Sequence, residues 1–141
     1  MNGQDMSKYV DFIRALELKD ISLKELKATV RRRIPPEHIK VAHRITVEHE
    51  FLDEGKIDFI VRAEFKFRDV DSRKVAASIT ISLKLSYTYS GSVEPDEETI
   101  EEFKSTSLML NAWPYIRFWV QTITQSFGWS PFLLPLIKFI E

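Results

Sequence analysis

Apolar and polar residues alternate along three consecutive segments, and the apolar residues fall on odd-numbered positions in each. The segments span residues 39–51, 57–67 and 75–89, and the last has an apolar side chain at every odd position. Strict alternation is typical of a strand with one buried face. The linkers at 53–55 and 69–72 are short enough for hairpins, so the pattern predicts an antiparallel sheet.

A fourth strand is predicted upstream, from Leu16 through Ile21 toward Val30, with a bulge or shift near residues 19–20. Before it, four apolar residues have the spacing of one helical face, although they could equally extend the strand: Met6, Tyr9, Val10 and Ile13. The expected organisation is one domain spanning 1–141, with an N-terminal extension at 1–14 and the sheet at 15–90.

A long helix is predicted over residues 95–128, because Pro95 suits a first helical position and three acidic residues follow it. We expect a kink at Pro114 and a helix end at Gly128. One apolar stripe comprises Met109, Trp113, Ile116, Val120, Ile123 and Phe127. A second stripe beside it is predicted to form a subunit interface, and it comprises Leu108, Ala112, Tyr115 and Trp119.

The last 31 residues contain all three tryptophans and only three charged residues, so residues 129–141 are expected to form an apolar arm. Residues 118–137 carry no charge and have the length of a bilayer span. Six polar side chains and two prolines within this window argue against a span. The surplus apolar surface is instead expected to face other subunits or a hydrophobic partner.

Composition bounds the chemistry. The chain lacks cysteine, so it has no disulfides, and its first residues lack the apolar stretch of a secretory signal. We therefore expect a cytoplasmic protein. Its net charge of −1 indicates no general affinity for nucleic acid. No arrangement of residues indicates catalysis, a cofactor or a metal site. His43 and His49 are interpreted as buried, hydrogen-bonded histidines, Asp69 and Asp71 as turn residues, and residues 31–33 as a solvated basic strand end.

The sequences NAWPYIR at 111–117 and FGWSPFLLPLIKF at 127–139 resemble the main helix and the following loop of SecB-type chaperones, and LKDISL at 18–23 is similar to the first strand of that family. The resemblance implies an α+β protomer, with a four-stranded antiparallel sheet packed by a long helix, that assembles as a dimer of dimers. It also implies an ATP-independent chaperone that uses no cofactor and holds unfolded polypeptides in hydrophobic grooves. Transferred onto this chain, those grooves lie at residues 34–39 and 129–136 and include Ile34, Ile39, Trp129, Phe132, Leu133, Leu134 and Leu136.

Two features depart from typical family members. The chain stops at Glu141, so the C-terminal helix of the family is expected to be missing or greatly shortened. Export members dock the SecA motor through an acidic sheet face, whereas the even positions of the three clear strands carry six basic and four acidic residues: Lys40, Arg44, Arg62, Lys66, Arg68 and Lys84, against Glu48, Glu50, Asp58 and Glu64. This balance favours a relative that serves an antitoxin over one that serves the export motor.

Two other functions remain open at this point. A carrier of a small apolar ligand would enclose a pocket between sheet and helix, lined by Phe65, Phe67, Tyr87 and Tyr89. A structural oligomerisation module would use the whole apolar tail for self-association.

Overall fold

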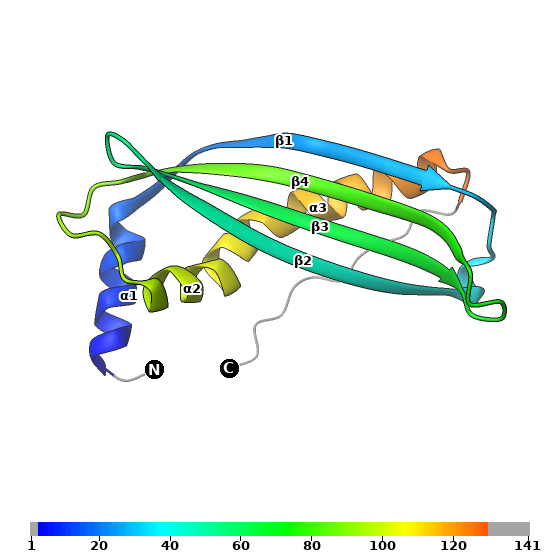
Figure 1. Cartoon of the computed structure of the whole chain (residues 1–141), viewed down its shortest axis with the longest axis horizontal. Coiled ribbons are helices and arrows are strands. Elements are labelled where there is room, and N and C mark those ends of the chain that lie inside the picture. The colour runs from blue at the N-terminus through cyan, green and yellow to red at the C-terminus, as the bar shows by residue number, and fades with distance from the viewer. Residues whose placement is uncertain (1–2, 130–141) are drawn as a thin grey trace.

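The computed structural model describes residues 3–129 and has an α+β architecture (Figure 1). The elements are α1 (Gly3–Ala15), β1 (Leu16–Val30), the short 3-10 helix η1 (Pro36–His38), β2 (Ile39–Leu52), β3 (Lys56–Asp69), β4 (Val75–Tyr89), α2 (Glu97–Ser105) and α3 (Ser107–Ser126). The four strands form one antiparallel sheet in the order β1-β4-β3-β2. The fold class predicted from the sequence is confirmed, and the segment before β1 is a helix rather than an extension of the strand.

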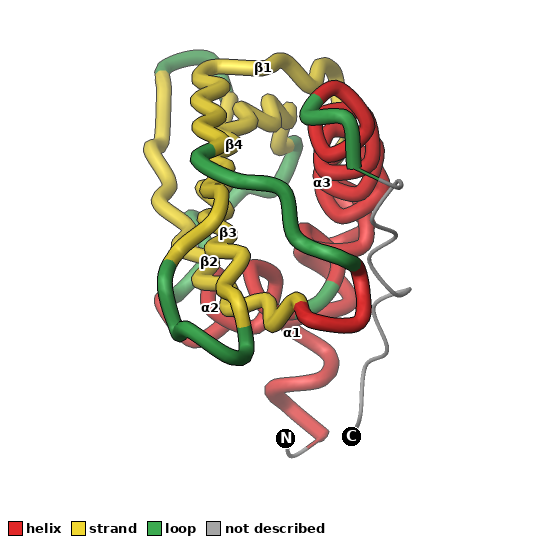
Figure 2. The backbone as a smooth tube through the Cα atoms, turned by 90° about the vertical axis from the view of Figure 1, so that its right-hand side faces the viewer, coloured by secondary structure: helices red, strands yellow, loops and turns green. Residues whose placement is uncertain are grey.

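The helices cover one face of the sheet, and the strand register explains why (Figure 2). Odd positions of β3 and β4 pair across the two strands and point to the helices, and from Ile57 to Tyr87 nearly all of them are buried. The even positions carry mainly Ser, Thr and charged residues on the opposite, helix-free face. The period of two along each strand therefore separates an apolar side from a polar side.

Two bulges keep β1 in phase with this pattern. The register shifts between Leu18 and Asp20, where the sequence predicts it, and again between Leu23 and Glu25. Each bulge inserts one residue, so the apolar positions change parity twice while staying on the helix side. The residues that share this side are Leu16, Leu18, Ile21, Leu23, Leu26, Ala28 and Val30.

An aromatic cluster around Phe103 of α2 joins the helices to the sheet. The Phe103 ring lies 5.5 Å from that of Phe12, 5.1 Å from that of Phe59 and 5.4 Å from that of Tyr87, measured between centroids. The Tyr87 hydroxyl accepts a hydrogen bond of 2.8 Å from the Asn111 side chain, so its polar end has a partner. Because these residues come from α1, α2, α3, β3 and β4, the cluster fixes the positions of five elements at once.

The predicted long helix is interrupted, but at Thr106 rather than at Pro114. Thr106 separates α2 from α3, and its hydroxyl donates back to the Glu102 carbonyl at 2.7 Å, a bond that competes with regular helix geometry. Tyr9 of α1 hydrogen-bonds the side chains of Thr106 and Ser107 at 2.7 and 2.8 Å and thereby holds the junction. Pro114 lies on the exposed side of α3, where water can satisfy the carbonyl that lacks its usual donor.

Replacing Phe103 with Ala tests the role of this cluster. The variant loses a 2% exposed ring that contacts three other aromatic residues, so the free energy of unfolding should fall by about 3–5 kcal/mol in urea titrations. Val93→Ala, at a side chain that is 74% exposed, is the control and should change it by less than about 0.5 kcal/mol. Equal effects of the two substitutions would contradict the assignment.

Candidate functional site

The helix side of β2 is an apolar strip that the helices cover only in part. Ile39, Val41, Ile45 and Val47 are each half-buried. The β3 neighbours of the last three are buried, and they are Phe67, Ala63 and Val61. β2 is also an edge strand, because it pairs with β3 and with no other strand in residues 3–129. An extended polypeptide can add to such an edge through backbone hydrogen bonds while its side chains contact the apolar strip.

A hollow lies beside this strip, between β2 and the junction of α2 with α3. Its volume is about 440 Å³, and its lining consists of Ile45, Val47, Glu101, Lys104, Ser105 and Met109. Lys104 and Glu101 form an ion pair of 3.2 Å at the helical wall, so the hollow has an apolar floor and one charged side. We call the strip and this hollow together the β2 groove.

Trp129 packs into the core beside the start of β2. α3 ends in a Schellman motif: Gly128 has φ 82°, its N–H donates to the Gln125 carbonyl at 3.1 Å, and the Trp129 N–H donates to the Thr124 carbonyl at 3.3 Å. This turn directs the Trp129 ring against Phe67, at 5.6 Å between centroids, and Phe67 pairs with Val41 of β2. The predicted helix end at Gly128 is thus confirmed, and its geometry positions Trp129.

The indole N–H of Trp129 is buried and has no hydrogen-bond partner among residues 3–129. An unsatisfied buried donor costs about 1–3 kcal/mol. A carbonyl group that reached this nitrogen would recover part of that free energy.

The residues predicted to bind unfolded polypeptides fall into three groups. Ile39 is half-buried at the start of the β2 groove, whereas Ile34 and Trp129 are buried, with exposed fractions of 4% and 6%. The remaining four lie outside the described residues: Phe132, Leu133, Leu134 and Leu136. The sequence interpretation missed Ile45, Val47 and Met109. The signal was the presence of two histidines among the apolar residues of β2, which indicates that the helices do not cover this strand completely.

Those histidines are exposed, which corrects the expectation that His43 and His49 are buried. They belong to the edge strand, where no helix lies over the whole face. The His49 ring nevertheless packs against Phe51 and Phe59, and its partial desolvation together with the nearby Lys104 charge lowers the pKa of His49 below its ordinary 6.5. This shift favours the neutral form of His49, beside the β2 groove.

His38, Asp69 and Asp71 lie close enough for their ligand atoms to fall within 4.8 Å of one another. The existing contacts explain this arrangement without an ion. The Asp69 carboxylate accepts the Asp71 N–H at 2.9 Å, and these turn hydrogen bonds lower the pKa of Asp69. His38 is paired with Asp71 at 2.9 Å and links η1 to the β3–β4 turn. The turn predicted for Asp69 and Asp71 is present.

A second apolar surface lies between β1 and α3. Leu23, Leu26 and Val30 of β1 are 37–45% exposed, and Tyr115 and Phe118 of α3 are 46% and 58% exposed. A hollow of about 340 Å³ lies where residues 18–21 approach Tyr115. We call these five side chains the β1–α3 surface.

The predicted subunit interface requires a correction for two of its four residues. Leu108 and Ala112 are fully buried inside the protomer, so their side chains have no surface left to contact another subunit. The buried face of α3 includes Leu108 and Ala112 of the second stripe together with Ile116 and Val120 of the first. Tyr115 is exposed and Trp119 is half-buried, so for these two the interface remains a prediction.

Three of the four residues expected to line the pocket of a ligand carrier belong to the core. Phe65, Phe67 and Tyr87 are at most 3% exposed and pack in the core. A cavity of about 450 Å³ does lie at the edge of the molecule between α1 and residues 91–96, with Tyr89 in its wall. Its lining includes Lys8, Asp11, Glu94 and Asp96, which is not an apolar chamber.

No helix within residues 3–129 combines the length and hydropathy needed to cross a bilayer. This result covers α3 but not the second half of the uncharged window at 118–137.

Comparison with known proteins gives a clear structural match and no match by sequence. No protein-family model and no curated protein matches the chain. The SecB-like chaperone Rv1957 of Mycobacterium tuberculosis, solved in complex with a ChAD peptide from the antitoxin HigA1 (Rv1956), superposes with a TM-score of 0.81 at 16% identity and covers 96% of this chain and 99% of that one. A protein of unknown function from Streptococcus agalactiae has a TM-score of 0.55 at 9% identity, with 86% and 97% coverage. The fold of this chain is SecB-like, as the resemblance in its sequence predicts.

The lowered pKa of His49 makes a prediction about stability. As the pH falls, the unfolded chain protonates this side chain near pH 6.5, before the folded protein does, so stability should decline from that pH until folded His49 is also protonated. Urea midpoints measured between about pH 5 and 8 should show a shallower decline in His49→Gln. An unchanged slope in His49→Gln would show that other groups cause the decline.

Proposed function

We propose that this protein is an ATP-independent chaperone of the cytoplasm that binds extended, apolar segments of unfolded polypeptides in the β2 groove. The single observation that carries the proposal is the half-covered apolar strip along an edge strand, beside a hollow of about 440 Å³. The strip offers contact area without specific shape, and the edge offers backbone hydrogen bonds. Neither the apolar contact nor the backbone hydrogen bonds depend on the client's sequence.

Burial of apolar area contributes about 25 cal/mol per Å², so several client side chains are needed before binding outweighs the ordering of the chain. The length of β2 suits this requirement, since Ile39–Leu52 spans about 14 × 3.3 Å, or roughly 45 Å. Ile39 and Val41 lie toward one end of the strand, and Ile45, Val47 and Met109 lie near its middle. A client would contact these sites one after another.

We further propose that the client is an antitoxin or another nascent chain rather than cargo for the SecA motor. The antitoxin peptide bound by the M. tuberculosis chaperone supports this choice, because that protein has the same fold. The helix-free face supports it as well, since basic residues interrupt its acidic ones. No step of this function requires a catalytic residue, a nucleotide or a metal ion.

The groove is tested with the double variant Ile45→Ser/Val47→Ser and the control Ile60→Ser. Ile60 is a half-buried apolar residue on the helix-free face of β3. Ile60→Ser therefore makes the same kind of apolar-to-polar change at a position outside the groove. Binding of a fluorescent, permanently unfolded polypeptide should weaken by about tenfold or more in the double variant and by less than about twofold in the control. Equal binding by all three proteins would exclude the β2 groove as the client site.

We propose that four copies assemble as a dimer of dimers, with the β1–α3 surface in an interface. Its exposed Leu23, Leu26, Tyr115 and Phe118 form an apolar area that a monomer seldom leaves in water. Light scattering should give a mass near four protomers, and Tyr115→Ser/Phe118→Ser should reduce it. The control Val93→Ser, at an exposed apolar side chain outside this surface, should keep the wild-type mass. If the double variant remains a tetramer, the interface lies elsewhere. If the wild-type tetramer does not bind unfolded polypeptide, the protein is an oligomerisation module instead of a chaperone.

A further inference from the structure

The helix-free face of the sheet has its charges sorted along the strands. At the end near the β3–β4 turn, Lys40 of β2 lies directly opposite Arg68 of β3, and Lys66 is in the next row, between Ala42 and Ser78. No acidic residue occupies these two rows on β2, β3 or β4. We call Lys40, Lys66 and Arg68 the basic end.

The opposite half of the same face is acidic. Glu50 of β2 lies opposite Asp58 of β3, and the same row continues through Ser86 to Asp20 of β1. We call Asp20, Glu50 and Asp58 the acidic band. Lys66 and Asp58 are eight residues apart on β3, which corresponds to roughly 27 Å at about 3.4 Å per residue.

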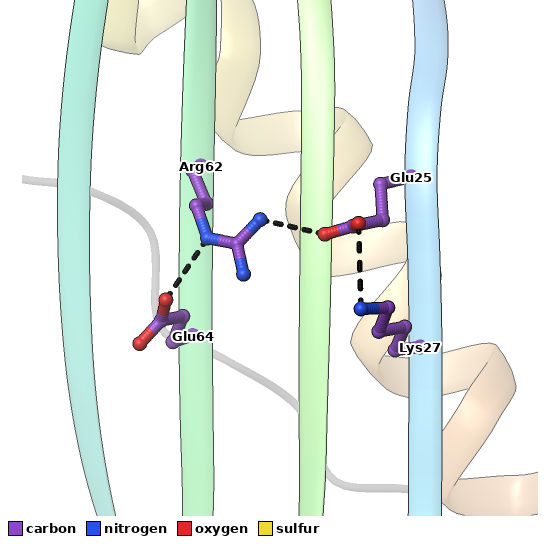
Figure 3. A network of polar contacts seen from close by, with 4 residues as sticks. All are labelled: Glu25, Lys27, Arg62 and Glu64. Atoms are coloured by element: carbon purple, nitrogen blue, oxygen red, sulfur yellow. Dashed lines mark hydrogen bonds and ion pairs between the residues drawn. The ribbon is translucent and has the colours of Figure 1, made fainter.

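A polar network occupies the middle of the face and separates the two ends (Figure 3). Arg62 donates to Glu25 of β1 at 2.6 Å and to Glu64 at 2.9 Å, and Lys27 lies 3.6 Å from Glu25. These contacts pass over β4, where Ser82 pairs with both Arg62 and Glu25 and is only 5% exposed. The two acidic residues of this network, Glu25 and Glu64, therefore already have cationic partners.

The basic end lacks any such compensation within the described chain. None of the ion pairs found in residues 3–129 includes Lys40, Lys66 or Arg68. Like charges placed directly opposite each other on neighbouring strands destabilise a sheet, and Lys40–Arg68 is such a pair. A partner of opposite charge would relieve this repulsion.

We propose that the basic end is a docking site for an acidic polypeptide segment, separate from the β2 groove and on the other side of the sheet. Opposite charges would steer the segment to this end, and the acidic band would prevent it from sliding along the face. The proposal does not depend on the proposed client site, because the two surfaces share no residue.

A polypeptide fits this surface better than a nucleic acid does. The helix-free face carries no aromatic side chain in the described strands, so unpaired bases would find nothing to stack on. A polyanion long enough to follow the face would also meet the acidic band. A short acidic segment avoids that repulsion.

The test uses a fluorescent peptide of alternating glutamate and serine and compares Lys40→Glu/Lys66→Glu with Lys56→Glu/Lys84→Glu. Both variants change the net charge equally and lie on the same face, but Lys56 and Lys84 belong to the acidic half. Anisotropy titrations should show about tenfold weaker binding for the first variant and less than about twofold change for the second. Added salt should weaken binding to the wild type.

Four binding results would overturn the proposal. They are equal loss in both variants, equal binding of a peptide with glutamine in place of glutamate, no saturable binding at all, and tighter binding of single-stranded DNA than of the acidic peptide. If Lys40→Glu/Lys66→Glu lowers the light-scattering mass, the basic end contacts the acidic band of a second copy, and the acidic-peptide assignment is also wrong. Lys40→Glu places an opposite charge across from Arg68, so it should not impair folding. Thermal melts of both variants check this.

Discussion

The organisation of this protein depends on one constraint: the apolar face of a four-stranded sheet must be covered, and the helices of the chain cover only its centre. α3 packs against β4, so the odd positions of β3 and β4 are almost completely buried. The outer strands are left in part to solvent, with Val47 of β2 half-buried and Val30 of β1 45% exposed. Incomplete covering gives the protein a stable core and two apolar surfaces at the same time.

Much of the sheet could be predicted because a period of two leaves a strong signal in sequence. The strands, both hairpins and the bulge near residues 19–20 are present where the pattern placed them. The second bulge was not recognised, although the change from Leu23 to Leu26 carries the same signal as the first. Local pattern thus determines the strands better than it determines their irregularities.

The helices and the candidate site were harder to predict, because tertiary contacts decide them. Thr106 interrupts the helix through a side-chain bond and a contact with Tyr9, which is 97 residues away, whereas Pro114 is tolerated at an exposed position. Leu108 and Ala112 are fully buried within the protomer, which the spacing of the two stripes did not predict. Similarly, the pairing of neighbouring strands sorts the charges of the helix-free face into rows, which a count of even positions cannot show.

The strand order also has a consequence for how the chain folds. β2, β3 and β4 are sequential neighbours and can form from local hairpins, but β1 must wait for β4, since Leu16 pairs with Tyr89 and Val30 with Ala77. Closing a loop of that length slows folding, because entropy is lost before the contacts form. On a ribosome, β1 therefore emerges before the other three strands and is incorporated into the sheet last, so the newly made chain itself exposes apolar strand residues for a time.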